Sequence, residues 1–325
     1  MMQPDWQPTA SLQALRNRAE LLQFVRGFFA SRQVMEVETP VLARHGVSDL
    51  HLDCISAETA AGMGFPDRRG YLQTSPEYHM KRLLAAGSGP IYQVFRAFRD
   101  GELGRRHNPE FTLLEWYRPG FTDDELMTEV GELVAGWLTL DTAPARISYR
   151  QALQQWAELD PFEATDAELR TACAVWLDKA LIDTLSRDVC LDVIMTHQVE
   201  PALAHEPPTF ICHYPASQAA LAKTSVIDGH AVAHRFELYV RGVELCNGYW
   251  ELTDAEEQAR RFELDNQLRA EAGKPVMAAD TFLLAALKAG MPASAGVALG
   301  LDRLLMVSRG TDNIADVMAF PAPRA

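Results

Sequence analysis

The chain has 325 residues, of which 48% are apolar and 23% charged, so it can bury a full core and is not intrinsically disordered. Its net charge of −14 argues against a protein whose main task is to grip a nucleic-acid backbone, because such binding needs a concentrated positive surface. Five widely spaced cysteines without a CxxC pair argue against a disulfide framework or a structural zinc site. With no signal-peptide pattern and no run of about 18 apolar residues, we expect a cytoplasmic globular enzyme without membrane association.

Hydrophobic periodicity predicts the order of the helices and strands. In chain order these are helix 11–33, strand 34–40, strand 71–74, helix 76–84, strands 91–98 and 110–118, helix 122–139, a mostly helical segment 141–208, strands 209–214, 232–240 and 243–250, helices 253–269 and 278–289, strand 294–299 and helix 301–309. The strands come in neighbouring pairs and do not alternate with helices, which predicts an α+β fold with an antiparallel sheet flanked by helices. Rossmann and P-loop signatures are absent from the sequence.

A basic loop joins the two predicted strands 91–98 and 110–118. It concentrates cationic side chains in an acidic protein: Arg96, Arg99, Arg105, Arg106 and His107. Arginine offers planar, bidentate donors to phosphate, so the loop is a candidate phosphate clamp, and Phe111 beyond it could stack on a base. A solvated basic loop is the alternative.

Three glutamates, Glu237, Glu244 and Glu251, recur at seven-residue spacing in a β-rich stretch. A two-residue turn at 241–242 predicts a hairpin with the pairs Val240–Val243, Tyr239–Glu244 and Leu238–Leu245. Glu237 and Glu244 then share a face, and two carboxylates on one face suit Mg²⁺. Glu251 falls on the opposite face and needs a bulge near 247–248 to turn it back. The exposed face of an ordinary hairpin is the alternative.

The run GVALGLDR (296–303) predicts a strand that passes directly into a helix. Glycines at 296 and 300 permit a close approach of the backbone to a ligand. Arg303 falls in the first helical turn, where the helix dipole disfavours a cation, so a neighbouring anion would explain it. An ordinary strand–helix junction is the alternative.

Acidic and hydroxyl side chains spread over several predicted elements suggest a pocket for an amine. They are Ser75, Glu77, Glu115 and Tyr117, with Pro76 opening the helix at 76–84. Taken singly, each acid is equally typical of a protein surface.

Together these segments resemble class II aminoacyl-tRNA synthetases. FRDGELGRRHNPEF (98–111) is similar to motif 2, GVALGLDR to motif 3, and the first helix with Thr39–Pro40 to motif 1. Lysyl-tRNA synthetases are closer still, through SPEYHMKR (75–82), RHNPEFTLLEWY (106–117) and GVELCNGYWELTDAEEQARRF (242–262). The resemblance implies one class II catalytic domain over residues 1–325, with a mostly helical insertion at about 140–205. We expect no anticodon-binding OB-fold, because its five strands cannot fit before residue 11.

The resemblance also implies site roles, with ATP and Mg²⁺ as cofactors and Arg99 and Arg303 as catalytic cations. ATP would contact Arg99, Asp100, Gly101, Glu102, His107, Asn108, Phe111, Glu244, Leu245, Gly300 and Arg303. Glu237 and Glu244 would hold Mg²⁺. The amino-acid substrate would contact Ser75, Pro76, Glu77, Glu115, Tyr117, Asn247, Glu251 and Ala298. Gly101 departs from the family, which has a glutamate there, and we expect Glu102 to take over the contact of that glutamate with adenine.

A stand-alone chain of this kind is similar to a paralogue of lysyl-tRNA synthetases that ligates a lysine-type residue to a lysine side chain of elongation factor P. This implies elongation factor P as acceptor, lysine or (R)-β-lysine as substrate, a homodimer and no stable tRNA binding. The alternatives are a truncated synthetase acting on tRNA or a small amine, an enzyme like asparagine synthetase A, and an inactive paralogue. Glu115 and Glu251 suit a substrate with a basic side chain, which argues against an enzyme like asparagine synthetase A. Intact Arg99 and Arg303 argue against an inactive paralogue.

Overall fold

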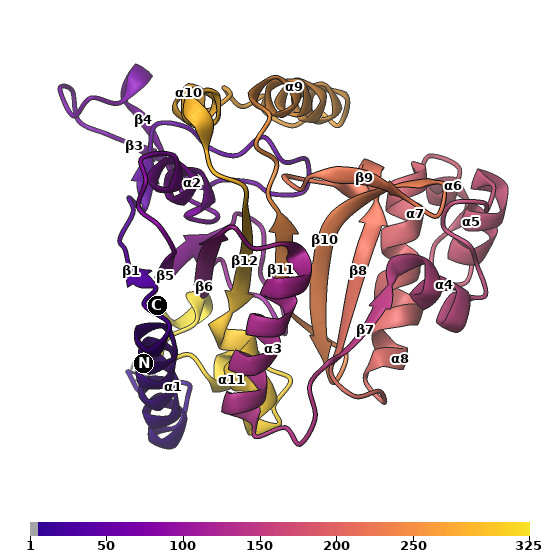
Figure 1. Ribbon diagram of the computed structural model, residues 1–325, viewed down its shortest axis with the longest axis horizontal. Coiled ribbons are helices and arrows are strands. Elements are labelled where there is room, and N and C mark those ends of the chain that lie inside the picture. The colour runs from indigo at the N-terminus through magenta and orange to yellow at the C-terminus, as the bar shows by residue number, and fades with distance from the viewer. Residues whose placement is uncertain (1–5) are drawn as a thin grey trace, which may run out of the picture. The chain divides into compact units, whose positions relative to one another are not determined.

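The computed structural model describes residues 6–325 (Figure 1). Contacts divide these residues into two compact units, one formed by the chain up to Gly120 with Thr253–Ala325 and the other by Phe121–Leu252. Each unit combines sheet strands with packed helices, so the predicted α+β class is confirmed. In the described chain, no helix is both long and apolar enough to cross a membrane.

The first unit is built on β5 (Ile91–Phe98), β6 (Glu110–Pro119) and β12 (Ser294–Gly300), which pair antiparallel in that order. The short strand β1 (Met35–Glu36) joins β5 in parallel, so the sheet is mixed at this edge. A small second sheet contains β2 (Leu42–Ala43), β4 (Arg69–Leu72) and β3 (Ser56–Glu58). The helices are α1 (Leu12–Ser31), α2 (Glu77–Ala85), α9 (Ala255–Glu271), α10 (Thr281–Gly290) and α11 (Leu301–Arg309), with 3₁₀ turns at Pro66–Arg68, Ile314–Asp316 and Ala322–Arg324.

The core of this unit lies where the apolar stripe of α1 meets the sheet. Leu21, Val25 and Phe29 recur every four residues along α1 and are buried, which is the spacing of one face of an amphipathic helix. The Phe29 ring stacks on Tyr92 of β5 with 4.3 Å between ring centroids and meets Trp116 of β6 edge-on at 5.4 Å. Burial of one such aromatic side chain contributes about 1.5–3 kcal/mol, so this contact fixes α1 on the β5–β6 hairpin.

The second unit centres on the long strand β10 (His230–Val240). Its antiparallel neighbours are β11 (Val243–Trp250), β8 (Thr209–Pro215) and the short β9 (Thr224–Ile227), a strand that the sequence pattern missed. β7 (Ala145–Ser148) joins β8 in parallel. The helices are α3 (Asp123–Leu138), α4 (Tyr149–Ala157), α5 (Asp166–Cys173), α6 (Lys179–Ile182), α7 (Arg187–Ile194) and α8 (Glu200–Leu203), with a 3₁₀ turn at Ala216–Gln218 and a π-helical turn at Met195–Val199.

The β10–β11 hairpin differs from the prediction in its register. Tyr239 faces Glu244 as predicted, but Leu238 faces Cys246 and not Leu245, because the register shifts between Leu238 and Tyr239. This bulge lies closer to the turn than the one predicted near 247–248. Glycine is required at position 248 for a different reason. A Cβ there would lie 2.3 Å from the Phe236 ring, so only glycine leaves room for that ring.

Candidate active site

The loop between β5 and β6 brings Arg99 close to two other predicted nucleotide-binding residues of the first unit, Phe111 and Glu102. Its guanidinium lies 4.9 Å from the centroid of the Phe111 ring, and its Nη1 lies 3.6 Å from Glu102 Oε1. Gly101 between them has φ of 76°, a left-handed conformation that favours glycine. Asp100 Oδ1 accepts a hydrogen bond from the Gly101 amide over 2.9 Å and so holds this turn.

The same unit brings Arg303 of α11 to His107 of the loop. Arg303 Nη2 donates to His107 Nε2 over 2.7 Å, so the imidazole proton resides on Nδ1. Desolvation and the Arg303 charge lower the pKa of His107, although much of the residue remains exposed. The start of α11 is anchored by buried Asp302, which pairs with Arg18 and accepts from the Thr112 amide over 2.6 Å. Arg303 is therefore held by both its helix and its histidine partner.

Asn108 is buried in this loop with its amide bonded to backbone groups. Its Nδ2 donates to the Glu110 carbonyl over 2.6 Å, and its Oδ1 accepts from the Ala322 amide over 2.9 Å. These bonds shape the loop, and a direct contact of Asn108 with ATP stays a prediction. Gly300 directly precedes α11, and a Cβ at this position would lie 3.7 Å from side-chain atoms of Arg303.

Glu115 is the buried carboxylate of the predicted amine pocket. Ser75 Oγ and the Tyr117 hydroxyl donate to its two carboxylate oxygens, each over 2.8 Å. Ala298 of β12 lies opposite Glu115 in the register, so its methyl group is next to this carboxylate on the sheet. Only 1% of Glu115 is exposed, which makes it a preformed acceptor in a setting that strengthens electrostatic contacts.

Glu77 begins α2, next to buried Pro76. Its amide donates to Ser75 Oγ over 3.0 Å, which links it to the Glu115 group. Its carboxylate accepts from Lys81 Nζ over 2.6 Å, and Lys81 is itself buried. A substrate amine at Glu77 would therefore share the carboxylate with Lys81, a partner at i+4 that the helical prediction could have identified.

Glu237 lies in the second unit at the centre of a hydrogen-bonded group. Its Oε2 accepts from the hydroxyls of Tyr214 and Tyr239, each over 2.6 Å, and its Oε1 accepts from Arg235 over 2.5 Å. Burial would raise the pKa of Glu237, but the Arg235 charge and the two hydroxyls outweigh it and lower that pKa. Arg235 and Tyr239 share a strand face with Glu237, whereas Tyr214 comes from β8 and carried no sequence signal.

The donor set around Glu237 fits a hard divalent cation. The carboxylate is ionised, and among the described residues Oε1 accepts from Arg235 alone, which leaves acceptor capacity on that oxygen. Glu244 lies opposite Tyr239, and Asn247 lies opposite Glu237 itself. Asn247 Oδ1 is buried without a hydrogen-bond partner among the described residues, so it is a further oxygen donor beside Glu237.

The remaining predicted residues of the second unit lie along β11 and just beyond it. Leu245 is buried next to Glu244, at the bulge that shifts the register. Glu251 follows the strand, forms an isolated bridge with Ala222 and is 2% exposed. The structure thus places Glu237, Glu244 and Asn247 along one hairpin, and the role of Glu251 stays a prediction.

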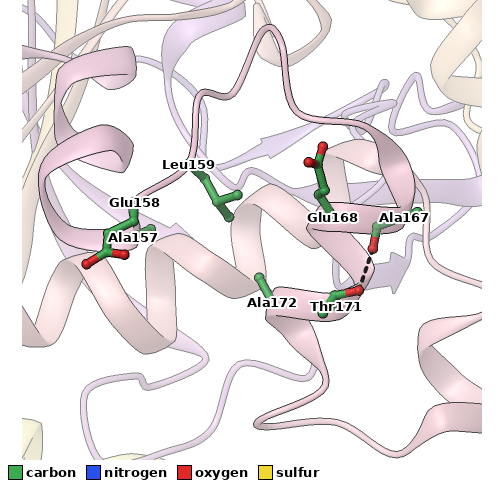
Figure 2. Close-up of a pocket in the computed structure, with 7 residues that line it drawn as sticks. All are labelled: Ala157, Glu158, Leu159, Ala167, Glu168, Thr171 and Ala172. Carbon is green, nitrogen blue, oxygen red and sulfur yellow. Dashed lines mark hydrogen bonds between the residues drawn. The ribbon is translucent and has the colours of Figure 1, made fainter.

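A separate hollow lies in the helical part of the second unit, at the end of α4 and along α5 (Figure 2). None of the predicted site residues line it. The only hydrogen bond drawn there joins the Thr171 hydroxyl to the Ala167 carbonyl over 2.7 Å within one helix. The lining residues are Ala157, Glu158, Leu159, Ala167, Glu168, Thr171 and Ala172, which offer no convergent set of polar groups.

Comparison with known proteins identifies relatives over nearly the whole chain. A family model described as tRNA synthetases class II (D, K and N) matches residues 5–324. An elongation factor P–(R)-β-lysine ligase of Salmonella arizonae is 50% identical over 322 residues, which cover 98% of each chain. Ligases of the same name from Salmonella paratyphi B and Enterobacter sp. are 49% and 50% identical, again over 98% of each chain.

Proposed function

The chain belongs to the class II tRNA synthetase (D, K and N) family and is an ATP-dependent ligase, and we propose that it activates lysine or (R)-β-lysine and transfers it to elongation factor P. Identity of about half the residues to ligases named for this reaction supports the proposal. The observation that carries it is the β5–β6 hairpin, which presents Arg99 and Phe111 at its loop and buried Glu115 on β6. One hairpin thus offers cations for a phosphate and an anion for an amine.

In the proposed reaction, Arg99 and Arg303 hold the phosphates. Arg99 Nε is a buried donor without a hydrogen-bond partner among the described residues, so an anionic group there would satisfy it. Arg303 would bind the terminal phosphate, with its guanidinium held by His107. Phe111 would stack on adenine, and the other loop residues would contact the nucleotide as the family resemblance implies: Asp100, Gly101, Glu102 and Asn108.

Glu237 and Glu244 are the proposed Mg²⁺ ligands. Leu245, which follows Glu244 in β11, is proposed to contact the nucleotide. When bound, Mg²⁺ would offset negative charge on the phosphate oxygens. The protein's part is to keep Glu237 ionised by means of Arg235 and two tyrosine hydroxyls.

Glu115 is the proposed acceptor for a substrate ammonium group, oriented by Ser75 and Tyr117. Ala298 would line the same wall, and Pro76 and Glu77 would lie beside it. The family resemblance extends the proposal to Asn247 and Glu251 for the same substrate. An ammonium group at a buried carboxylate forms charge-assisted hydrogen bonds, which explains a preference for a lysine-type substrate.

The chemistry needs no covalent bond to the enzyme. The substrate carboxylate attacks the α-phosphorus in line and pyrophosphate leaves, which forms the acyl-adenylate. The acceptor ε-amine then attacks the acyl carbon, AMP leaves and the amine loses a proton, so that an amide bond remains. Positioning and electrostatic stabilisation by the two arginines supply the catalysis.

The proposed acceptor is a protein lysine and not tRNA. A net charge of −14 gives little of the basic surface that tRNA binding requires. Arg105, which pairs with Asp312 and is 70% exposed, and neighbouring Arg106 would face the acceptor. The test is to incubate enzyme, ATP and radiolabelled lysine or β-lysine with elongation factor P and with bulk tRNA in parallel. Label on the protein alone supports the proposal, and label on tRNA alone favours the truncated synthetase.

We also propose that the chain acts as a cytoplasmic homodimer with one catalytic domain and an insertion at 140–205. Phe24 and Phe28 on α1 form a half-buried row with Arg32 at the C-cap, whose guanidinium lies 3.5 Å from the Phe28 ring centroid. Met35 at the edge strand is 50% exposed, so this side of the motif 1 segment offers apolar surface to a second copy. Sedimentation at micromolar concentration should show a dimer, and a 36.1 kDa species alone would contradict it.

A further inference from the structure

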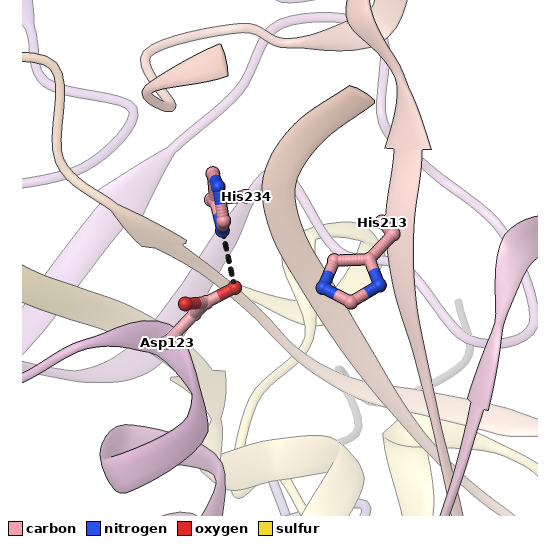
Figure 3. A group of neighbouring side chains, drawn as sticks. All are labelled: Asp123, His213 and His234. Atoms are coloured by element: carbon pink, nitrogen blue, oxygen red, sulfur yellow. Dashed lines mark hydrogen bonds and ion pairs between the residues drawn. The ribbon is translucent and has the colours of Figure 1, made fainter. Parts of the chain in front are cut away.

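Three side chains that the proposed reaction does not use converge in the second unit. Asp123 begins α3, His213 lies in β8 and His234 lies in β10. Each offers one ligand atom, and these atoms all lie within 4.8 Å of one another. Figure 3 shows His234 bonded to Asp123 and one ring nitrogen of His213 pointing toward them.

Both histidines lie where the β8–β10 ladder is interrupted. The register between these strands shifts between Ala233 and Phe236, and His234 lies in that shift. His213 has φ of 58°, a left-handed conformation that is uncommon for histidine inside a strand. Backbone strain of this kind persists where the surrounding structure holds it, and it is concentrated at ligand sites. The two irregularities turn the two imidazoles toward Asp123.

The His234 ring is already oriented in the way metal-bound histidines are. Its Nδ1 lies 3.0 Å from Asp123 Oδ2, and its Nε2 lies 2.9 Å from Ser225 Oγ on β9. A ligating histidine usually donates its other N–H to an oxygen, which fixes the ring and its tautomer. With Nδ1 as the ligand atom, the ring proton would reside on Nε2 and be donated to Ser225. The side chains of His234 and Asp123 are 13% and 6% exposed, so the site is largely shielded from water.

We propose that Asp123, His213 and His234 bind a divalent transition-metal ion of the Zn²⁺ class. Two imidazole nitrogens and one carboxylate oxygen suit Zn²⁺, whereas Mg²⁺ prefers oxygen ligands alone. Tetrahedral Zn²⁺ with bonds of about 2.1 Å holds its ligand atoms about 3.4 Å apart. His234 Nδ1 and Asp123 Oδ2 lie 3.0 Å apart, close to this spacing, and the ligand atoms of all three residues lie within 4.8 Å of one another, so small side-chain movements would bring them to the metal.

Such an ion would cross-link β8 and β10 at the point where their register shifts. The same two strands carry Tyr214 and Glu237, whose hydrogen bond lies one residue beyond His213 on β8. Bound metal would therefore stabilise the strand pair that supports Glu237, without itself entering the reaction. The proposal does not depend on the identity of the amino-acid substrate.

The test is a titration of metal-stripped, full-length protein with Zn²⁺ in competition with a chromophoric chelator. We expect one Zn²⁺ per chain, and visible absorption typical of tetrahedral coordination when Co²⁺ replaces it. His234→Asn and His213→Asn should each weaken binding at least 100-fold. Asparagine tolerates the left-handed conformation at 213, so that variant keeps the backbone. Ser225→Ala should weaken binding about tenfold, as loss of a supporting hydrogen bond does.

His230→Asn is the matched control, because His230 begins the same strand and stacks on Phe162 with 4.6 Å between ring centroids. It should bind Zn²⁺ like the wild type, as should Glu237→Gln, which removes a proposed Mg²⁺ ligand. Zn²⁺ should also raise the unfolding temperature of the wild type and not that of His234→Asn. Wild-type protein that binds no Zn²⁺, or binding that persists in both histidine variants, would overturn the proposal and leave a hydrogen-bonded Ser225–His234–Asp123 chain.

Discussion

Arg303 donates to His107 Nε2 across 2.7 Å, which joins the first turn of α11 to the β5–β6 loop within one unit. The guanidinium carries a permanent charge, so its partner must be a neutral imidazole with an open lone pair. Whatever protonates His107 also breaks this hydrogen bond and places two cations side by side. The position of Arg303 is thereby coupled to pH.

The first prediction concerns that coupling. Desolvation and the Arg303 charge hold the pKa of His107 below its ordinary value of 6.5. The hydrogen bond should therefore be fully formed at neutral pH and lost as pH falls below 6.5 through the lowered pKa, so the KM for ATP should rise in that range. His107→Gln keeps an acceptor at every pH and should flatten the profile. Pyrophosphate exchange between pH 5 and 8 measures this, and an equally steep profile in the variant would refute it.

The same shift has a small consequence for stability. Because the folded-state pKa is depressed, the unfolded chain binds more protons between the two pKa values, and stability falls as pH drops through that window. The contribution is complete above the unfolded value of 6.5. Urea unfolding of the wild type and His107→Gln at both ends of the window compares the slopes, and the variant should lose less stability on acidification.

The second prediction concerns the ionisation of Glu237. Tyr239→Phe removes one of the two hydroxyls that donate to its Oε2. Since hydrogen bonds to buried charged groups contribute about 1.5–3 kcal/mol, the free energy of unfolding should fall by that amount. The Mg²⁺ concentration needed for half-maximal adenylate formation should also rise.

Tyr92→Phe is the control for this variant. Tyr92 donates to Glu36 over 3.0 Å, and Glu36 is 40% exposed. Loss of this hydrogen bond should therefore lower the free energy of unfolding less than Tyr239→Phe does. Its Mg²⁺ dependence should match that of the wild type. An unchanged Mg²⁺ dependence in Tyr239→Phe would argue against Glu237 as a metal ligand.

The third prediction concerns the departure from the family at Gly101. Its φ of 76° would strain a glutamate, whereas the Glu102 carboxylate lies 3.6 Å from Arg99. Glu102→Ala should therefore raise the KM for ATP several-fold and change the KM for lysine little. Glu110→Ala is the control, because Glu110 lies on the same hairpin and pairs with exposed Arg96 at 3.8 Å. If the ATP KM is the same in both variants, Glu102 has not replaced the missing glutamate.

Local patterns predicted the elements well, because alternation and turn chemistry act over neighbouring residues. The 241–242 turn and the Tyr239–Glu244 pair followed from the chain alone. The bulge between Leu238 and Tyr239 did not, and neither did the reason for Gly248, since only the fold reveals that the Phe236 ring occupies the space beside it.

In the candidate site too, local neighbours could be predicted from the sequence and distant partners could not. Arg235 could have been found beside Glu237 by strand alternation, but Tyr214 joins that group only because β8 pairs with β10. Asp123 and His234 are 111 positions apart and carry no shared motif, so their contact needed the tertiary structure. Partners distant in sequence are therefore what the structure adds.

The last prediction concerns substrate choice at Ala298. This residue lies opposite Glu115 in the β12–β6 register and packs against the cluster of Phe95, Ala97 and Leu113. The family resemblance implies a glycine at the corresponding position of lysyl-tRNA synthetases, and the methyl group of Ala298 narrows the space beside the Glu115 carboxylate. A lysine and a β-lysine place their amines one carbon apart, and one methyl group in a pocket changes discrimination by roughly 1–3 kcal/mol.

We expect the wild type to prefer (R)-β-lysine and Ala298→Gly to shift the ratio of kcat/KM toward α-lysine by about tenfold or more. Ala295→Gly is the matched control, because Ala295 is fully buried on the opposite face of the same strand. That variant should lose stability through the added backbone freedom and keep its substrate preference. Pyrophosphate exchange with both amino acids measures the ratio. An equal change for the two substrates in Ala298→Gly would mean that this methyl group does not contact the part of the substrate that distinguishes them.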